Sequence, residues 1–243
     1  MLVLSGCATI GAPHDDANDP LEPFNRRVFK ANMALDRAVI KPVAKGYRDL
    51  LPQFIRDRLR NFFNNLTEPR IFVNDFLQVR INAAGITFTR FVTNSIIGVA
   101  GLFDWAARHN LPRQTGDFGQ TLYRWGVADG PYLVIPLLGP SNVRDAVGLG
   151  GDLYVDFYVD PAGRVFSDKA GKQFNFGRAI VDGIDLRSRN IESLDQLEAT
   201  SLDLYAQLRS IVRQRRQVEL DEARGKAPEA PAELIDPGAA APR

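Results

Sequence analysis

Four acidic residues lie close enough together in the middle of the chain to share one site. Asp145, Asp152, Asp156 and Asp160 are four to seven positions apart, a spacing that can place several of them on one face of a helix. Paired carboxylates can cleave glycosides or hold a divalent cation. The same residues also serve as helix caps, turn residues and solvated faces, so a catalytic and a structural interpretation both stay open.

Other kinds of catalytic site need residues that this chain has in short supply. The 243 residues include two histidines, His14 and His109, and one cysteine, Cys7. A zinc site or a cysteine–histidine nucleophile requires more of these side chains. Ser141 is not set in a nucleophile elbow, and residues 148–151 match neither a dinucleotide-binding nor a phosphate-binding loop, so we expect a turn there. The sequence predicts no cofactor, no metal site and no enzymatic activity.

Arginines recur near the C-terminal end of the chain. Arg209, Arg213, Arg215 and Arg216 fall within one helical segment. Forked guanidinium groups can bind the phosphates of lipid head groups, although such a run also forms an ordinary solvated helix face. Both interpretations stay open.

The run Leu4-Ser5-Gly6-Cys7 resembles a bacterial lipobox, in which a peptidase cleaves before a cysteine that carries diacylglycerol through a thioether. Two or more acyl chains bind a membrane far more firmly than one, since each buried methylene contributes about 0.8 kcal/mol. Residues 1–6 lack the basic and apolar regions of a complete signal peptide, so we interpret them as a truncated one. We expect Cys7 to be the lipid-attachment site and residues 7–18 to be a tether. The alternative is a free thiol in an N-terminal tail.

The composition, with 45% hydrophobic and 24% charged residues, is that of a globular protein. A net charge of +1 argues against nucleic acid as a partner, because binding phosphates needs a surplus of cations. No run of 18 apolar residues occurs, so no membrane-spanning helix is expected. We predict one helical domain over residues 19–220 and a disordered tail over residues 221–243.

Apolar residues recur at three- and four-residue steps along most of the chain, which predicts a mainly helical fold. We expect helices from Phe24 and from Phe54, a bend at Pro42, and a separate helix after Pro69 that is buried on two faces through Val79. Further helices are expected over residues 83–97 and, without a break, over residues 197–218. Residues 116–151 are rich in Gly and Pro, which predicts turns and short elements, with an extended piece over residues 132–138.

The helices from Phe24 and Phe54 are the best candidates for membrane contact. A helix with a basic face opposite an aromatic one can lie in a bilayer interface, while a soluble helical core explains the same pattern. The side chains predicted to touch the membrane are Phe24, Val28, Phe54, Ile55, Leu59 and Phe62.

Four stretches of the chain resemble the outer-membrane lipoproteins of the MlaA or VacJ family. They are residues 19–47, with Asp19-Pro20-Leu21-Glu22; residues 61–78, with Glu68-Pro69 and Phe76-Leu77-Gln78; residues 89–104, with Thr89-Arg90-Phe91; and residues 118–145, with Phe118-Gly119-Gln120-Thr121-Leu122, Gly130-Pro131-Tyr132 and Arg144-Asp145. The last stretch is the most specific, and the match extends from about Asp19 to Arg216.

The resemblance implies a single ring-shaped helical domain in the inner leaflet of the outer membrane, with an amphipathic channel through its centre. It further implies that phospholipids misplaced in the outer leaflet pass to a periplasmic carrier of the MlaC type, beside trimeric porins. A polar channel wall would keep head groups wet, because an unpaired buried charge is costly. Our candidates for that wall are Arg144, Asp145, Asp152 and Asp156. Two alternatives remain: a lipid-anchored periplasmic hydrolase that uses clustered carboxylates, and a structural adaptor that binds porins.

Overall fold

The computed structural model describes residues 18–159 and 168–225, and most of these residues are helical. The predicted mainly α fold is therefore confirmed. In chain order the elements are α1 (Glu22–Leu35), the π-helix η1 (Asp36–Ile40), α2 (Lys41–Leu50), α3 (Gln53–Leu77), α4 (Ile81–Ile96), α5 (Trp105–Arg108), α6 (Phe118–Arg124), β1 (Tyr132–Ile135), β2 (Gly139–Asn142), α7 (Val143–Val159), α9 (Asp168–Arg189), α10 (Ile191–Thr200) and α11 (Leu204–Ala223).

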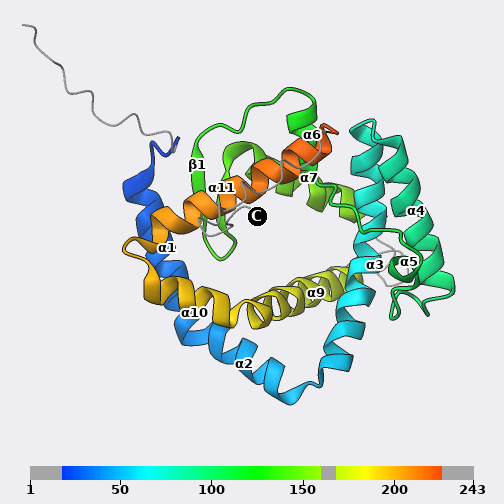
Figure 1. Ribbon diagram of the computed structural model, residues 1–243, viewed down its shortest axis with the longest axis horizontal. Coiled ribbons are helices and arrows are strands. Elements are labelled where there is room, and N and C mark those ends of the chain that lie inside the picture. Colours follow the sequence, from blue (N-terminus) through cyan, green and yellow to red (C-terminus); the bar gives the residue numbers. More distant parts are fainter. Residues whose placement is uncertain (1–17, 160–167, 226–243) are drawn as a thin grey trace, which may run out of the picture.

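The helices follow one another around the periphery of the molecule (Figure 1). The blue rod of α1, η1 and α2 forms one side, and the antiparallel pair α3 and α4 forms the opposite side. Helices α6, α7 and α11 connect the two sides along one edge, and α9 and α10 connect them along the other. The main packing contacts join α3 to α4, α6 to α7, and α2 to α9. A channel through this arrangement stays a prediction.

Helices α1 and α2 form one continuous rod, because the π-helical turn η1 joins them. Pro42 does not interrupt the helix, and it lies in the first turn of α2, directly after the π-helical turn. Ion pairs attach the rod to the C-terminal half of the chain. Arg187 of α9 forms a forked pair with Asp36 at 2.8 and 2.9 Å, and Lys41 lies 2.7 Å from Asp195 of α10.

Helix α3 runs through Pro69, which corrects the prediction of a separate helix after this residue. An internal proline costs about 3 kcal/mol, and packing on both sides of it offsets that cost. Leu66 and Ile71 are buried within the helix, where α3 packs along α4. The expectation of two buried faces through Val79 is wrong, because Phe76 and Val79 are exposed.

The C-terminal segment forms two helices where one was expected. Ser201 is extended and ends α10, and Asp203 begins α11 by accepting a hydrogen bond from the backbone N–H of Ala206. Helix α11 then continues to Ala223, beyond the predicted domain boundary at 220, because Leu220 and Ala223 are buried. The remainder of the predicted tail, residues 226–243, lies outside the described residues.

The segment rich in Gly and Pro combines a hairpin with two closely packed helices. Strands β1 and β2 pair antiparallel, with Tyr132 opposite Asn142 and Ile135 opposite Gly139, so part of the predicted extended piece is confirmed. The turn expected at residues 148–151 is instead part of α7. A Cβ on Gly148 would lie 2.5 Å from the backbone nitrogen of Gly119, and one on Gly151 would lie 2.3 Å from the Phe118 ring. These glycines are therefore needed for the close approach of α6 to α7.

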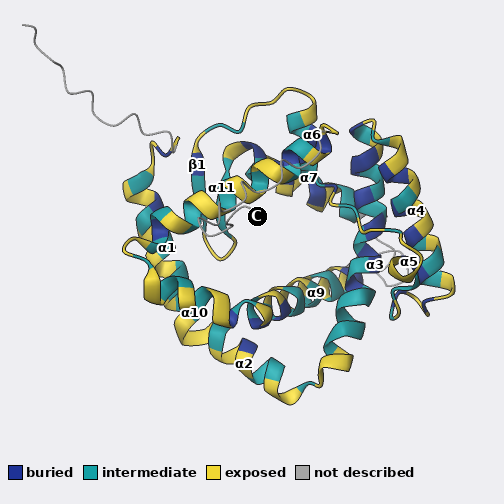
Figure 2. Cartoon of the chain, in the orientation of Figure 1, coloured by how far each residue is buried: buried dark blue, intermediate teal, exposed yellow. Residues whose placement is uncertain are grey.

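Polarity in this fold is distributed unusually for a water-soluble protein. Among the described residues, 16 polar or charged side chains are buried, against 13 hydrophobic ones. The hydrophobic clusters are small: one surrounds Phe63 and Leu66, and the other joins Tyr132, Val134 and Tyr205. Figure 2 shows that the buried residues gather where helices meet, around α3, α6 and α7.

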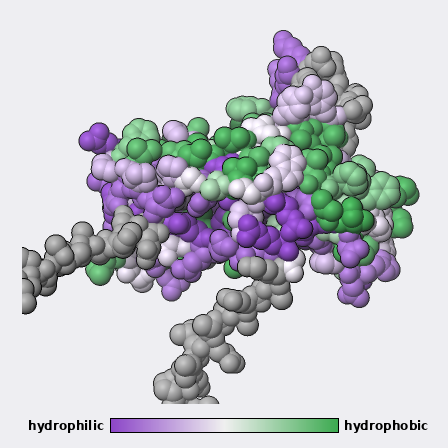
Figure 3. All heavy atoms as spheres, turned by 90° about the horizontal axis from the view of Figure 1, so that it is seen from above, coloured by the Kyte–Doolittle hydropathy of each residue, from purple (hydrophilic) through white to green (hydrophobic). Residues whose placement is uncertain are grey.

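Large hydrophobic side chains are exposed on most of the helices. Examples on α1, α3, α4 and α9 are Phe24, Phe54, Phe76, Phe88, Ile96 and Phe176. In the edge-on view of Figure 3, hydrophobic residues gather over the upper half and the right-hand end, above a mainly hydrophilic zone. No helix in the described ranges is long and apolar enough to cross a bilayer. Apolar surface on this scale marks a site of contact with a membrane or another protein.

Candidate functional site

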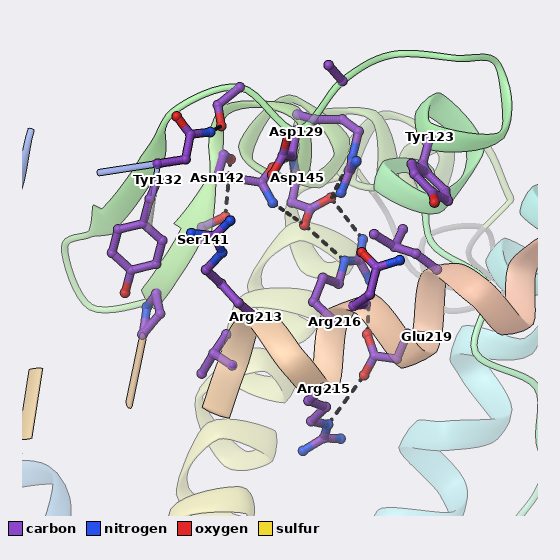
Figure 4. Close-up of a pocket in the computed structure, with 18 residues that line it drawn as sticks. Tyr123, Asp129, Tyr132, Ser141, Asn142, Asp145, Arg213, Arg215, Arg216 and Glu219 are labelled. Carbon is purple, nitrogen blue, oxygen red and sulfur yellow. Dashed lines mark hydrogen bonds and ion pairs between the residues drawn. The ribbon is translucent and has the colours of Figure 1, made fainter. Parts of the chain in front are cut away.

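A cleft of about 540 Å³ lies between the hairpin, the start of α7 and helix α11. Figure 4 shows its lining, with Asp145 and Asn142 on one wall and Arg213 and Arg216 rising from α11 on the other. The charged side chains in the lining are Arg144, Arg213, Arg215, Arg216, Asp129, Asp145 and Glu219. Four cations against three anions give the lining a net positive charge.

Arg216 holds the two walls of the cleft together. Its guanidinium donates to both carboxylate oxygens of Asp117 at 2.7 and 2.8 Å and to both of Asp145 at 2.9 and 3.0 Å. Asp117 also caps α6 by accepting from the backbone N–H of Gln120. Although burial opposes the charged form, the hydrogen bonds from Asp117 and Asp145 raise the pKa of Arg216 further above its ordinary value.

Arg144 lies beneath the same cluster and is almost fully buried. It donates to Asp145 from Nε and Nη2, each at 3.1 Å, and its guanidinium carbon lies 5.1 Å from the Tyr123 ring centre. Burial alone would raise the pKa of Asp145, but hydrogen bonds and charges from Arg216 and Arg144 lower it below its ordinary value. Asp145 is thus held as a carboxylate between two arginines.

The first described residues fasten the N-terminal side of the domain to this region. Asn18 lines the cleft, its side chain donates to the Gly130 carbonyl, and its own carbonyl accepts from the backbone N–H of Tyr132. The next residue, Asp19, is buried; it accepts from the Tyr205 hydroxyl and lies 2.7 Å from Arg209. Burial, with the charge of Asp19, raises the pKa of Tyr132 to about 12, against the opposing charges of Arg209 and Arg213.

Asp152 and Asp156 point to a different set of partners, between α7 and α3. Asp152 accepts from the Asn74 side chain at 2.9 Å and from the backbone N–H of Phe118 at 3.1 Å. Asp156 lies 3.1 Å from Arg70. Burial raises the pKa of Asp152 to about 6, although the Arg70 charge and the Asn74 hydrogen bond favour its ionised form. Of the four predicted channel residues, Arg144 and Asp145 therefore line the cleft, and Asp152 and Asp156 belong to a separate polar cluster.

The structure also separates the acidic residues that the sequence suggested as a possible catalytic site. Each of the three carboxylates is occupied by hydrogen bonds or ion pairs with the protein, and Asp145 has partners that Asp152 and Asp156 lack. The fourth, Asp160, lies outside the described residues. Within the described ranges, no group of three or more His, Cys, Asp or Glu side chains is arranged to hold a metal ion.

The six predicted membrane-contacting residues divide into two groups. Phe24, Phe54 and Ile55 are exposed, so they are available for contact. The other three are partly buried: Val28 packs against the Tyr132 cluster, and Leu59 and Phe62 pack against Phe63 and Leu66, so membrane contact by all six stays a prediction. On each of α1 and α3, the apolar stripe thus has residues that face the surroundings and residues that pack into the core.

Glu68 and Arg90 belong to the sequence motifs of the family resemblance, but the sequence assigned them no role. Arg90 and Glu68 form a buried ion pair at 3.2 Å, and Arg90 also lies 3.0 Å from Asp104. Asp117 and Tyr205 are likewise central to the contacts of α11. The available signal was the occurrence of Glu68 and Arg90 in the motifs Glu68-Pro69 and Thr89-Arg90-Phe91.

The fold and the cleft define a class of helical proteins with a polar interior and an apolar outer surface. The family model described as MlaA lipoprotein matches residues 17–219. The chain belongs to the MlaA lipoprotein family.

Its relatives and a solved structure agree with this assignment. The chain is 36% identical over 217 residues to the intermembrane phospholipid transport system lipoprotein MlaA of Escherichia coli K12, covering 88% of this chain and 82% of that protein. It is 30% identical to the Haemophilus influenzae protein of the same name over 241 residues, covering 97% and 92%. A chain solved in a study of the structural basis for maintenance of bacterial outer membrane lipid asymmetry superposes with a TM-score of 0.72 at 34% identity, covering 83% of this chain and 98% of that one.

Proposed function

We propose that this protein is an outer-membrane lipoprotein that removes mislocalised phospholipids from the outer leaflet and passes them to a periplasmic carrier of the MlaC type. Its activity maintains the lipid asymmetry of the outer membrane. Family membership and the names of the relatives support the pathway. The observation that carries the proposal for this chain is the polarity of the fold, in which charged groups are buried and large apolar side chains face outward.

The physical argument concerns the two halves of a phospholipid. Acyl chains can stay against apolar protein surface or lipid, while a charged head group needs water or polar partners along its whole path. A body with exposed Phe24, Phe54 and Ile55 can sit in a leaflet, and its polar interior can line the path of the head groups. Arg144 and Asp145 are our candidates for that lining, and Asp152 and Asp156 stabilise the wall behind it.

The proposal includes no bond-making or bond-breaking step. The hydrolase alternative needs carboxylates that are free to exchange protons with a substrate, whereas Asp145, Asp152 and Asp156 are engaged by the protein. Trimeric porins remain proposed partners for the exposed apolar faces. The proposed anchor, Cys7, and its tether lie outside the described residues, and we retain them from the sequence motif.

The test is the amount of phospholipid on the surface of cells that lack this protein. Deletion should raise surface phospholipid, the intact chain should restore the normal level, and Cys7→Ala should fail to do so at equal protein abundance. Cys7→Ser in parallel controls for side-chain size. Normal surface lipid in the deleted strain would contradict the transport proposal, and full restoration by both Cys7 variants would contradict the lipid anchor alone.

A second experiment separates transport from a porin-binding adaptor. After gentle extraction of the complex, mass spectrometry should detect phospholipid bound to this protein in excess of detergent-exchanged controls. An adaptor would retain porin and carry no phospholipid. That outcome would overturn the proposed lipid path while leaving the family assignment intact.

A further inference from the structure

The outer edge of strand β1 is bonded to side chains of α1, in the place where a larger sheet would have its next strand. Asn25 of α1 is fully buried. Its side-chain amide donates to the Tyr132 carbonyl and accepts from the backbone N–H of Val134, both at 3.0 Å. Figure 1 shows β1 beside the blue rod that begins with α1.

Asn32 repeats this pattern at the end of the strand. Its amide donates to the Ile135 carbonyl and accepts from the backbone N–H of Leu137, again at 3.0 Å each. Leu137 has a φ of 67°, in the left-handed region that is costly for a residue with a Cβ. Because the Leu137 side chain is exposed, its burial does not offset this cost, and the bond from Asn32 helps to do so.

The spacing of the two asparagines matches the spacing of the groups that they bind. Asn25 and Asn32 are seven positions apart, which is about 10.5 Å along a helix. Val134 and Leu137 are three positions apart, which is about 10 Å of extended chain. An asparagine amide has a donor and an acceptor, as a peptide group has. Helix α1 therefore offers β1 the bonds that a neighbouring strand would offer.

We propose that Asn25 and Asn32 are positioning residues that fix the hairpin against α1 by replacing a neighbouring strand. The inference rests on the proposed function, because the hairpin forms one wall of the cleft. The two attachments differ in burial. Asn25 is fully buried and also donates to Asp19 at 2.8 Å, whereas Asn32 is partly buried. Asn25 is thus the firmer attachment, and Asn32 places the turn that follows β1.

The hairpin connects these asparagines to the proposed path of the head groups. Asn142 of β2 lies opposite Tyr132 of β1. Its side chain donates to the Asp145 carboxylate and accepts from the Asp145 backbone N–H, both at 2.8 Å. Moving β1 away from α1 should therefore move a wall of the cleft without removing any group from that wall.

Amide hydrogen exchange tests the attachment at Asn32. Exchange is followed residue by residue by NMR of the full chain in detergent micelles. Asn32→Leu removes the donor and the acceptor at similar volume, so exchange of the Leu137 N–H should become about tenfold faster. The Leu133 N–H should change little, because Tyr132 and Val134 bond outward and the alternation of an antiparallel strand directs Leu133 toward β2.

Two further variants make the exchange test specific. Asn32→Asp retains an acceptor, so the Leu137 N–H should stay protected, although the bond to the Ile135 carbonyl is lost. Asn25→Leu should accelerate exchange at Val134 by about tenfold as well. Asn82→Leu is the matched control, because it makes the same substitution at an exposed position of α4 and should alter neither amide.

Surface phospholipid tests whether the attachment matters for function. In cells that lack the native protein, Asn32→Leu should leave more phospholipid on the surface than the intact chain does at equal protein abundance. Asn32→Asp should restore part of the difference, and Asn82→Leu should match the intact chain. A loss of abundance alone cannot produce this order, since the comparison is made at equal abundance.

Unchanged exchange of the Leu137 N–H in Asn32→Leu would overturn the attachment, and so would equal acceleration at Leu133 and Leu137, which indicates general loosening. Faster exchange at Leu137 with normal surface phospholipid would refute the positioning role and leave the transport proposal intact. Normal surface phospholipid in the deleted strain would contradict the transport proposal and the positioning role in it. The attachment itself would then still be decided by the exchange pattern.

Discussion

Arg216 and Asp117 form a forked ion pair, with nitrogen–oxygen distances of 2.7 and 2.8 Å, although 99 positions separate them in the chain. The pair joins the last helix to the N-terminus of α6. Arg216 also binds Asp145 at the start of α7. This one side chain therefore connects α11 to both α6 and α7, which lie far from it in the sequence. The connection therefore joins α11 to the elements that face it across the cleft.

Replacing Arg216 by leucine should lower the free energy of unfolding by about 3 kcal/mol, because Asp117 and Asp145 would lose a largely buried partner. Thermal unfolding in detergent micelles measures the loss. The neighbouring Arg215→Leu is the control, since that side chain is 81% exposed and its removal should change stability by less than about 0.5 kcal/mol. Similar losses in the two variants would contradict the role given to Arg216.

Two glycines of α7 should respond in opposite ways to the same substitution. Gly148→Ala should destabilise the protein by about 1–3 kcal/mol, because its Cβ would meet the backbone of Gly119 at 2.5 Å. A Cβ on Gly150 would have nothing within 4 Å, so Gly150→Ala should stabilise the helix by about 0.5–1 kcal/mol. Melting temperatures of the pair under identical conditions provide the comparison. Tolerance of alanine at Gly148 would refute the close packing of α6 on α7.

Asp152 should make stability depend on pH in the acid range. Its pKa is about 6 in the folded protein and ordinary in the unfolded chain, so the folded state retains the proton longer as pH rises. This contribution to stability is present below about pH 4 and is lost by about pH 6, a change of up to about 3 kcal/mol.

The variant Asp152→Asn keeps an acceptor for Asn74 and Phe118 and has no proton to lose. From pH 4 to 7, its free energy of unfolding should therefore rise relative to that of the wild type by up to about 3 kcal/mol. Asp49→Asn serves as the control, because the Asp49 side chain is 70% exposed. Parallel pH profiles for the wild type and Asp152→Asn would rule out burial of a titrating group at this position.

Phe54 and Phe63 lie on the same helix, α3. Substitutions at these two positions should affect membrane binding and folding separately. Phe54 is 58% exposed, so Phe54→Ser should reduce partitioning into liposomes roughly tenfold or more, with little effect on unfolding. Phe63 is 9% exposed, and Phe63→Ala should cost about 3–5 kcal/mol of stability. Liposome flotation of these variants in a Cys7→Ala background removes any contribution from acyl chains. Unchanged flotation of the Phe54 variant would contradict membrane contact at this end of α3.

The sequence predicted the helical class and the family well, because apolar periodicity and motifs such as Gly130-Pro131-Tyr132 are local signals. It failed where distant contacts decide the outcome. Packing against α4 keeps α3 helical through Pro69, and the contact of Gly148 with Gly119 explains a glycine pattern that resembles a turn. The partners of Arg216 could not be inferred, since nothing near an arginine in the chain indicates carboxylates about 70 and 100 positions away.

The attachment of Asn18 and Asp19 has a mechanical consequence. Asn18 is bonded to β1 and Gly130, and Asp19 to Tyr205 and Arg209 of α11. A force applied to the chain before Asn18 is therefore borne by several hydrogen bonds and an ion pair at the same time. It does not act directly on α1, so α1 is not unwound first. Tension from that end is transmitted first to the hairpin and the last helix, the two walls that enclose the cleft.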